Sequence, residues 1–515
     1  MLMNRFVGSI FLLFFYEING NLFNYPFFSS NLSTDSRQLQ TNNCQRYLIK
    51  FYDYTSTNKD ILDNRTKWLK NLINRTTETK NSNFIINDYT TDYNNNNLNV
   101  GLFELSPLAY NLLSGINNND NNINNTIIVN ESNYYIEYIE EDSVYNGLDA
   151  RQYLATDNYS DDHYISPIIP NNTAIDPLTN TNLTKFRLIT NEFSIDNNVP
   201  WGLDRIDQRN LPLDGNFHPP NHKEGEGVDI YVLDSGARIT HKEFQNRIIP
   251  GKNFSPDQSS EDISDCNGHG THVLSLTGGK TYGAAKKATL RPVRVYDCSN
   301  SGPMSQALEG ISYVLREIKS SSNKKIVINM SFGGKASAIL NSAISQLHQA
   351  GAVVVVAAGN ENQPACNLSP GSAREAITVG ASDPDDTFGT YSNYGPCVDL
   401  ISPGTSIPGA YSSSDTSERL MTGTSMAAPL VSGVVANFLS VYDSTPTKTR
   451  KVFECSANKN ILKEVPVNTP NQLVYSPANG WDSQCTNIVQ ANYGISNYSF
   501  GYNNLVILLL LLFLA

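Results

Sequence analysis

The sequence Gly423-Thr424-Ser425-Met426-Ala427-Ala428-Pro429 places one serine among small residues at the start of an apolar run. The run continues through residues 430–439 and predicts a buried helix. Small neighbours let another backbone approach closely, and a serine in the first helical turn lies near the positive end of the helix dipole. Most serines at such positions are helix caps. Ser425 is therefore a candidate nucleophile only if a base, an orienting acid and an oxyanion donor occur elsewhere.

Groups suited to these three roles lie upstream. The apolar run at residues 228–233 ends in Asp234, which places an acid at the carboxyl end of a predicted buried strand, where α/β sheets carry their sites. Asn267-Gly268-His269-Gly270-Thr271-His272 supplies a histidine, and the run at residues 352–359 ends directly before Asn360. The order of acid, base and nucleophile along the chain is that of subtilisin.

These segments resemble the signature blocks of the subtilisin-like serine proteases, the subtilases of peptidase family S8. Two further blocks, Asn329-Met330-Ser331-Phe332-Gly333-Gly334 and Ala357-Ala358-Gly359-Asn360, extend the resemblance. It covers roughly residues 200–477 in the same order and at similar spacing, and it is strongest for the proteinase-K-like branch. The resemblance implies an α/β, subtilisin-like fold with a parallel sheet between helices, preceded by a small α+β propeptide domain.

The resemblance also implies a serine endopeptidase that works through an acyl-enzyme and needs no catalytic cofactor. Ser425 attacks the scissile carbonyl, His269 takes the hydroxyl proton and passes it to the leaving amine, and Asp234 holds the imidazole. Asn360 donates its side-chain amide to the oxyanion together with the Ser425 backbone N–H. Asp234 as a strand-end cap and Asn360 as a turn residue are each plausible alone but not jointly. His272 is assigned to packing or a hydrogen bond.

Two extended segments resemble the edges between which these enzymes bind peptide or protein substrates as an added strand. They are Ser301-Gly302-Pro303 and Ser331-Phe332-Gly333, and Ala357-Ala358-Gly359 is expected to form a wall of the primary specificity pocket. Apart from Glu361, these blocks hold no acidic side chain. We therefore expect cleavage after neutral or apolar residues, with kexin-like cleavage at paired basic residues as the alternative.

A structural calcium ion is a further implication of the resemblance. Asp399 falls where proteinase-K-like enzymes place a calcium carboxylate. The carbonyl oxygens of Arg374 and Ala376 would complete the site, because a hard cation takes oxygen ligands. The alternative is that Asp399 forms only a salt bridge or a turn contact.

The chain has seven cysteines, at Cys44, Cys266, Cys298, Cys366, Cys397, Cys455 and Cys485. The resemblance pairs Cys266 with Cys298 and Cys366 with Cys397. Cys455–Cys485 follows by elimination only, Cys44 is the odd residue, and counting alone does not establish connectivity. Disulfides suit an oxidising, secretory route.

Other features agree with secretion. Residues 1–20 combine Arg5 with the apolar run 6–15 and fit a signal peptide, with a hydrophobic anchor helix as the alternative. Glycosylation sequons occur at Asn64, Asn74, Asn158, Asn182 and Asn253. The sequon at Asn329 falls on a predicted buried strand, where we expect no glycan. The net charge of −12 and the lack of a basic patch argue against a nucleic-acid partner.

Residues 44–146 resemble the I9-type propeptide that inhibits subtilases within the same chain. The strand at 46–51, a helix at 60–73 and the strand ending in Ile139-Glu140-Glu141-Asp142-Ser143-Val144 carry this resemblance. A small unrelated α+β domain is the alternative. Residues 147–199 are rich in Asn and Asp and are interpreted as a linker with a processing site, and residues 200–478 as the catalytic domain. The expected product is a self-processing zymogen.

Residues 479–515 are interpreted as a polar spacer and a hydrophobic tail. The tail at residues 505–515 is shorter than the roughly twenty residues of a spanning helix. With small residues at Gly494, Ser496 and Ser499, it fits a glycolipid-anchor signal. A short membrane-inserted tail and a buried segment are the alternatives. The expected location is extracellular or at the cell surface.

A function from a different class is an inactive subtilase-like surface protein that uses the fold only for binding, because a fold alone does not give a function. The presence together of Asp234, His269, Ser425 and Asn360 argues against that class.

Overall fold

The computed structural model describes residues 45–51, 100–105, 136–150, 199–320 and 324–490, and the short strands at 17–18, 21–22, 87–88, 174–175 and 182–183. The expectations for the apolar run 6–15, the helix at 60–73, Cys44, most of the linker and the tail lie outside the described residues. The chain divides into two units. Met1–Asn43 holds the antiparallel pair β1 (Glu17–Ile18) and β2 (Asn21–Leu22), and Cys44–Ala515 holds every other element.

The larger unit is built on an eight-stranded sheet in the order β11-β10-β13-β15-β17-β18-β22-β21, counted over the described residues. Neighbouring strands are parallel except β21 and β22. The strands are β10 (Val228–Asp234), β11 (Thr289–Arg294), β13 (Lys325–Met330), β15 (Val353–Ala357), β17 (Ile377–Ser382), β18 (Leu400–Pro403), β21 (Asn458–Lys459) and β22 (Gln472–Leu473).

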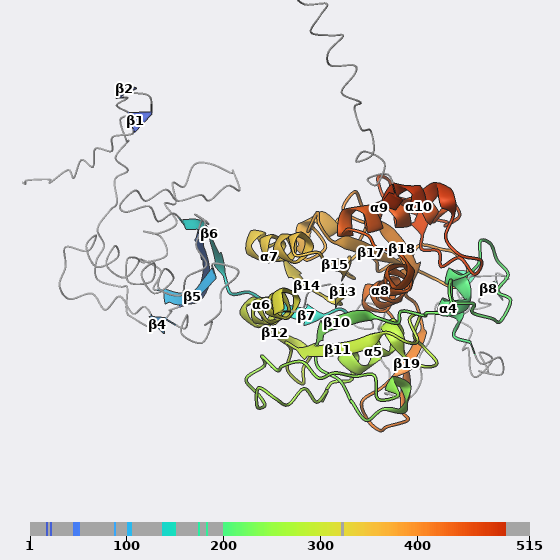
Figure 1. Cartoon of the computed structure of the whole chain (residues 1–515), viewed down its shortest axis with the longest axis horizontal. Coiled ribbons are helices and arrows are strands. Elements are labelled where there is room, and N and C mark those ends of the chain that lie inside the picture. Colours follow the sequence, from blue (N-terminus) through green and yellow to red (C-terminus); the bar gives the residue numbers. More distant parts are fainter. Residues whose placement is uncertain are drawn as a thin grey trace, which may run out of the picture. The chain divides into compact units, whose positions relative to one another are not determined.

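Helices cover both faces of this sheet (Figure 1). One face packs against α5 (His269–Gly278) and α8 (Thr424–Val441), and the other against α6 (Met304–Ser320) and α7 (Ala338–Gln349). The shorter helices are α4 (Trp201–Ile206), α9 (Pro446–Ser456), α10 (Ser483–Gln490), η1 (Lys242–Phe244) and η2 (Ala365–Asn367). The parallel sheet between helices that the sequence predicts is confirmed.

The apolar runs form central strands because both faces of each strand are buried. In β15, Val353 and Val355 pack into the core with α5 and α8, whereas Val354 and Val356 pack into the core with α6 and α7. Side chains alternate across a strand, so a continuous valine run serves both layers. Gly351, with φ of +95°, follows the end of α7 as a C-terminal glycine should.

A four-stranded antiparallel sheet precedes the catalytic region. It has the order β4-β5-β3-β6 and consists of β3 (Gln45–Phe51), β4 (Asn87–Asp88), β5 (Val100–Leu105) and β6 (Ile136–Glu141). The next strand, β7 (Val144–Gly147), belongs to a different sheet, in which it lies between β12 (Ser301–Pro303) and β14 (Phe332–Lys335). The remaining strands are β8 (Ala174–Ile175), β9 (Asn182–Leu183), β16 (Leu368–Ser369), β19 (Ile407–Ala410) and β20 (Glu418–Met421).

The catalytic domain extends beyond the boundary expected at residue 478. Trp481 is buried against Phe438 and Phe453, and α10 follows it directly. A disulfide between Cys455 and Cys485 joins α10 to α9. The polar composition of this stretch gave no indication of a helix, because only one side of α10 is buried.

Three disulfides join described cysteines: Cys266–Cys298, Cys366–Cys397 and Cys455–Cys485. Two of the sequons lie in buried positions. Asn329 is fully buried, and Asn253 donates its side-chain amide to the carbonyls of Ser255 and Ser259. The folded domain leaves no room for a glycan at either residue.

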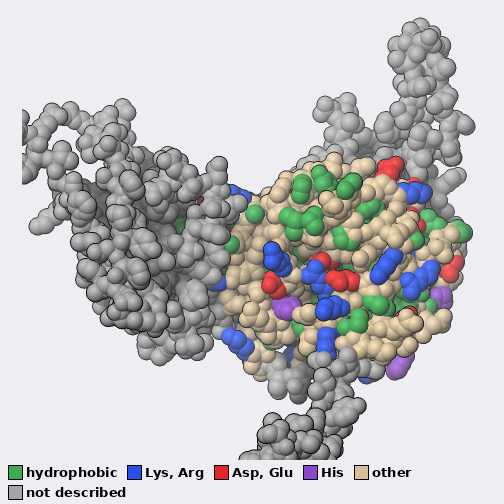
Figure 2. Space-filling model, turned by 90° about the horizontal axis from the view of Figure 1, so that it is seen from above, with side chains coloured by type: hydrophobic (Ala, Val, Ile, Leu, Met, Phe, Trp, Pro, Cys, Tyr) green, Lys and Arg blue, Asp and Glu red, His purple; other side chains and the backbone are tan. Residues whose placement is uncertain are grey.

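Two features of the described residues bear on a nucleic-acid or membrane partner. On the face shown in Figure 2, basic and acidic side chains of the described residues are interspersed. Among the described helices, α8 alone has the length and hydropathy of a membrane span, and 94% of that segment is buried inside the domain as its core helix.

Candidate active site

The three residues of the expected triad come from three elements that meet at one edge of the sheet. Asp234 is the last residue of β10, His269 the first of α5 and Ser425 the second of α8. Nδ1 of His269 lies 2.7 Å from Oδ1 of Asp234, and both side chains are buried. The structure thus brings together an acid and a base separated by 35 positions in the sequence.

Asp265 holds the start of α5 in place, and it was not among the residues predicted for the site. Its carboxylate accepts hydrogen bonds from Ser235 Oγ (2.9 Å), Gly268 N (2.8 Å) and Thr271 N (2.8 Å). A carboxylate at the positive end of a helix is stabilised by the helix dipole. The signal that could have identified Asp265 is an acid placed four residues before His269, where a helix begins.

Close backbone approach explains the glycine beside His269. A Cβ on Gly270 would overlap the carbonyl oxygen of Gly236, which directly follows the Asp234-Ser235 pair. The loop after β10 and the first turn of α5 therefore touch through backbone atoms. This contact sets the distance between Asp234 and His269.

Ser425 faces a backbone carbonyl rather than the imidazole. Its Oγ donates to the carbonyl oxygen of Ser331 at 2.9 Å, and Ser331 Oγ donates to the carbonyl of Ser425 at 3.1 Å. Nε2 of His269 is buried and has no hydrogen-bond partner. A rotation of the Ser425 side chain would offer its hydroxyl to that nitrogen.

Asn360 follows β15, and hydrogen bonds from Thr424, the residue before Ser425, hold its side chain in place. Its Oδ1 accepts hydrogen bonds from Thr424 N and Oγ1, both at 2.9 Å. Its Nδ2 is buried without a partner. A Cβ on Gly423 would lie 2.9 Å from this nitrogen and 2.7 Å from the carbonyl oxygen of Leu148, so both atoms flank the same glycine.

The pKa values of the two histidines of α5 shift in opposite directions. Burial lowers the pKa of His269, but the Asp234 carboxylate and its hydrogen bond raise it, and the net direction is upward from 6.5. Burial lowers the pKa of His272 to about 4, which keeps that ring neutral. Nε2 of His272 donates to the carbonyls of Ile407 (3.1 Å) and Arg419 (3.0 Å). His272 therefore has the hydrogen-bonding position expected for it.

The substrate-binding edges contain a strand of the same chain. β7 pairs antiparallel with β12, with Tyr145 opposite Gly302, and with β14, with Gly147 opposite Phe332 and Asn146 opposite Gly333. The boundary expected at residue 146 falls within this strand, which ends at Gly147. The available signal for this segment was a pair of apolar residues three positions apart, Tyr145 and Leu148.

The residues after β7 pass directly over the triad. The N–H of Leu148 donates to the carbonyl of Ser331 at 3.2 Å, and that of Ala150 donates to the carbonyl of Thr422 at 2.8 Å. Asp149 lies between them, and its charge contributes to the raised pKa of His269. The bond between Leu148 and Asp149 therefore lies beside the base and the nucleophile.

Two side chains of this segment are buried against apolar residues. Leu148 is 5% exposed, packs in one cluster with Ala357, and would contact a Cβ on Gly333 at 3.3 Å. Tyr145 is fully buried, and its ring lies edge-on to that of Phe332.

The rest of the expected pocket wall follows β15. Ala358 is buried next to Gly359, whose N–H donates to Thr424 Oγ1 at 3.1 Å. The acid of this region, Glu361, accepts a hydrogen bond from Asn393 Nδ2 at 2.6 Å. Its carboxylate is thus engaged by an amide.

Two carboxylates of β6 and its following turn bind helix starts of the catalytic region. Glu140 accepts hydrogen bonds from the N–H groups of Ala338 (2.8 Å) and Ile339 (3.3 Å) at the first turn of α7. Asp142 accepts from Ser305 N and Oγ, both at 2.8 Å, at the first turn of α6. Each carboxylate lies where a helix dipole is positive.

The calcium site expected at Asp399 does not fit the structure, because a side chain occupies it. The guanidinium of Arg450 donates to the carbonyls of Arg374 (2.5 Å) and Ala376 (3.2 Å) and pairs with the Asp399 carboxylate. These are the three groups that the sequence assigned to calcium. Burial raises the pKa of Asp399 to about 6, while Arg450 acts in the opposite direction. The salt-bridge alternative is therefore correct.

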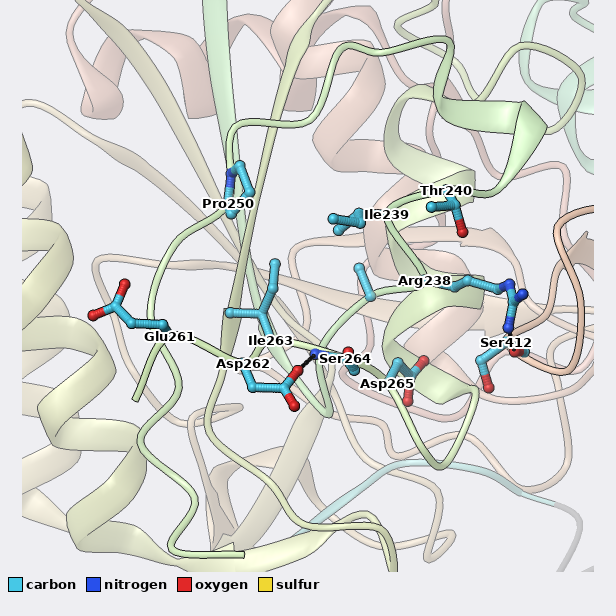
Figure 3. A pocket seen from close by; sticks show the side chains of 11 residues that line it. Arg238, Ile239, Thr240, Pro250, Glu261, Asp262, Ile263, Ser264, Asp265 and Ser412 are labelled. Atoms are coloured by element: carbon cyan, nitrogen blue, oxygen red, sulfur yellow. Dashed lines mark hydrogen bonds between the residues drawn. The ribbon is translucent and has the colours of Figure 1, made fainter. Parts of the chain in front are cut away.

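A cavity of about 340 Å³ lies beside the site and contains none of the triad residues (Figure 3). It is lined by the loop after β10 and by residues 261–265. Asp262 accepts a hydrogen bond from Ser264 N at 2.9 Å within this wall, and Arg238 extends toward Ser412. The expected substrate contacts lie instead along β12 and β14.

The chain is similar to known proteins. The model described as the subtilase family matches residues 225–502. The chain is 44% identical over 286 residues to an extracellular serine proteinase of Thermus sp. (strain Rt41A), covering 55% of this chain and 68% of that protein. It is 39% identical to the subtilisin-like serine protease pepC of Aspergillus niger, of which it spans 56%. A crystal structure of a cold adapted subtilisin-like serine proteinase is 41% identical, with a TM-score of 0.51, covering 54% of this chain and 98% of that one.

Proposed function

Since the chain belongs to the subtilase family of serine peptidases, we propose that it is a secreted or cell-surface endopeptidase made as a zymogen that cuts itself between Leu148 and Asp149. The observation that carries this proposal is the passage of the chain through its own substrate groove. The Leu148 N–H and the Ala150 N–H bind on opposite sides of the triad, to Ser331 and Thr422. That is how a peptide would lie with its Leu148 carbonyl facing the nucleophile.

The reaction follows from the groups around that carbonyl. Ser425 turns its hydroxyl from Ser331 to His269, gives its proton to Nε2 and bonds through Oγ to the carbonyl carbon of Leu148. The oxyanion receives hydrogen bonds from Asn360 Nδ2 and the Ser425 backbone N–H. Asp234 stabilises the charged imidazole.

Collapse of the oxyanion breaks the peptide bond. His269 gives its proton to the amide nitrogen of Asp149, which leaves as a new amino terminus. A water molecule, deprotonated by His269, then attacks the Leu148 ester and frees Ser425. The same cycle hydrolyses other peptide or protein substrates once the propeptide has left.

After cleavage, the propeptide that ends at Leu148 stays bound and inhibits the catalytic domain. β7 fills both substrate edges, and Glu140 and Asp142 bind the starts of α7 and α6. Charge-assisted hydrogen bonds of this kind are stronger than neutral ones. No substrate can enter the groove while these contacts persist.

The residues that fill the groove also suggest the specificity. Leu148 occupies the primary pocket and Tyr145 a second apolar pocket beside Phe332. We expect cleavage after leucine-like residues, favoured by an aromatic residue three positions earlier. Glu361, the acid of the expected pocket region, accepts a hydrogen bond from Asn393, and cleavage at paired basic residues is the alternative specificity.

The location belongs to the same proposal. Three disulfides suit an oxidising compartment. The expected glycolipid anchor at residues 505–515 is tested by phosphatidylinositol-specific phospholipase C. Release of the protein from cells supports the anchor, whereas retention in the membrane pellet favours the membrane-inserted alternative.

One comparison tests the self-cleavage. Full-length wild type and Ser425→Ala are secreted from the same host. The molecular masses of their products are measured, and the products are sequenced from the amino terminus. We expect Asp149 as the new terminus in wild type and an uncut chain in Ser425→Ala. Cleavage of Ser425→Ala at that bond would assign the cut to another protease.

A fluorophosphonate probe separates the enzyme from the inactive binding protein. It should label the processed wild type and leave Ser425→Ala unlabelled. Absence of labelling in both, with correct processing of neither, would favour the binding protein.

A further inference from the structure

We infer that Asn300 restricts the residue directly before the cleaved leucine position to glycine, an inference that rests on the proposed function and adds a substrate class to it. In the chain's own groove this residue is Gly147. Its N–H donates to the carbonyl of Asn300 at 3.0 Å, and it lies opposite Phe332 on the other edge. Gly147 is thus held between two fixed backbones.

The side chain of Asn300 occupies the space that any larger residue would need. A Cβ on Gly147 would lie 2.5 Å from Cγ and Oδ1 of Asn300, and closer still to Nδ2. Turning the amide about its last torsion moves only the oxygen and nitrogen. The overlap with Cγ remains, so the whole side chain must change its first torsion to admit an alanine.

The backbone of the turn that carries Asn300 is held in place, so room for an alanine must come from the Asn300 side chain. Asn300 has φ of +60° and is 9% exposed. Its N–H donates to the carbonyl of Asp297 at 3.0 Å. Oδ1 of Asp297 also accepts hydrogen bonds from Ser299 N (2.9 Å) and Ser301 N (3.2 Å), and the adjacent Cys298 is tied to Cys266. The backbone of this turn cannot retreat from the substrate.

The neighbouring positions of the segment, unlike Gly147, have room for a side chain. Tyr145 and Leu148 enter apolar pockets, whereas Asn146 is exposed. The geometry points to segments of the form aromatic, any residue, glycine, leucine as the preferred substrates. A glycine in the middle of such a segment also favours extended, exposed loops.

The test uses two quenched fluorescent peptides, Tyr-Asn-Gly-Leu-Asp-Ala and Tyr-Asn-Ala-Leu-Asp-Ala, and processed full-length protein. Variants are Asn300→Gly and Asn300→Ala, with Ser299→Gly as the control for loosening of the same turn. Wild type should cleave the glycine peptide with a kcat/KM about tenfold or more above the alanine peptide, as expected for overpacking of a rigid site. Both Asn300 variants should reduce the ratio to about threefold or less, mainly by faster cleavage of the alanine peptide.

Each result has a distinct meaning. Equal cleavage of the two peptides by wild type overturns the inference while leaving the proposed endopeptidase intact. Unchanged discrimination in both Asn300 variants overturns it as well, because the selecting group is then elsewhere. A reduced ratio in Ser299→Gly would assign the effect to turn rigidity and not to the Asn300 side chain. Failure of wild type to cleave either peptide, with no fluorophosphonate labelling, overturns the proposed function and this inference together.

Discussion

Ser425 donates its hydroxyl to the carbonyl oxygen of Ser331 at 2.9 Å, and the same carbonyl accepts the N–H of Leu148 at 3.2 Å. One backbone oxygen therefore holds both the nucleophile and the residue whose carbonyl it would attack. The hydroxyl must leave this oxygen before it can face His269. The bond to Leu148 remains through that rotation and keeps the scissile carbonyl in place.

Asn360→Ala should lower kcat with little change in KM, because the Nδ2 donor acts on charge that develops only in the transition state. In subtilisin, removal of the corresponding amide costs about 100- to 1000-fold, and we take that figure as the expectation. Asn360→Asp retains an acceptor for Thr424 but lacks the donor. Steady-state kinetics should show a comparable loss in both variants. Recovery of kcat in Asn360→Asp would mean that Asn360 acts by holding Thr424.

The pH dependence should report His269. A protonated imidazole cannot accept the Ser425 proton, so kcat/KM falls as the pH drops through the His269 pKa. The Asp234 carboxylate raises that pKa, and the acidic limb should therefore lie above 6.5. Asp234→Asn removes the negative charge, and its residual activity should decline at a lower pH than in wild type. An acidic limb at the same pH in both proteins would contradict His269 as the base.

Glu140→Ala should weaken retention of the cleaved propeptide. The change leaves the N–H groups of Ala338 and Ile339 without their carboxylate partner. Dilution series of the processed protein should give an inhibition constant about 10- to 100-fold higher. Glu141→Ala is the matched control, because Glu141 is the adjacent acid and is exposed. Equal weakening by both changes would point to net charge and not to the helix start.

Gly334→Ala and Gly333→Ala should alter two different subsites. A Cβ on Gly334 would lie 2.8 Å from the ring of Tyr145, whereas one on Gly333 would lie 3.3 Å from Leu148. Cleavage profiles on a peptide library should therefore lose the aromatic preference in Gly334→Ala and retain the leucine preference. Gly333→Ala should shift the latter toward smaller residues. Loss of both preferences in either variant would refute separate pockets.

Arg450→Ala should destabilise the domain and create a dependence on calcium. Removing one partner of a buried ion pair costs about 3–5 kcal/mol. We expect about 2–3 kcal/mol here, because 30% of the Arg450 side chain is exposed. Thermal unfolding is followed in the Ser425→Ala background to prevent autolysis, with added calcium or a chelator. Calcium should raise the Tm of Arg450→Ala more than that of the unchanged background.

Arg374→Ala is the matched control for this experiment. It removes the same charge from the same cradle, but the Arg374 side chain is exposed and only its carbonyl binds Arg450. Its Tm and calcium response should equal those of the background. An equal calcium response in Arg450→Ala and Arg374→Ala would show that Arg450 does not take the place of the ion.

The parts of the site that could be predicted are those encoded in contiguous residues. Asp234, His269 and Ser425 each lie at the end of an apolar run or the start of a helix, and such patterns are visible without a structure. The continuous valines of β15 likewise indicate a strand buried on both faces. The parallel sheet follows from the alternation of these elements.

What could not be predicted depends on contacts between distant residues. Arg450 reaches Asp399 across 51 positions, and nothing in its neighbourhood on α9 distinguishes it from a solvent-exposed arginine. The end of β7 at Gly147 could not be placed from composition, because pairing to β12 and β14 leaves few apolar residues in a polar stretch. The overlap that a Cβ on Gly147 would have with Asn300 depends on how two distant segments lie side by side, which spacing along the chain does not encode.

The guanidinium of Arg450 is part of the chain, so it does not dissociate as a bound metal ion would. A bound metal stabilises a protein by an amount that depends on its free concentration, and the effect disappears on dilution. The contribution of Arg450 to the loop at Arg374, Ala376 and Asp399 contains no such concentration term. At this locus the stability of the domain therefore does not depend on the free calcium concentration.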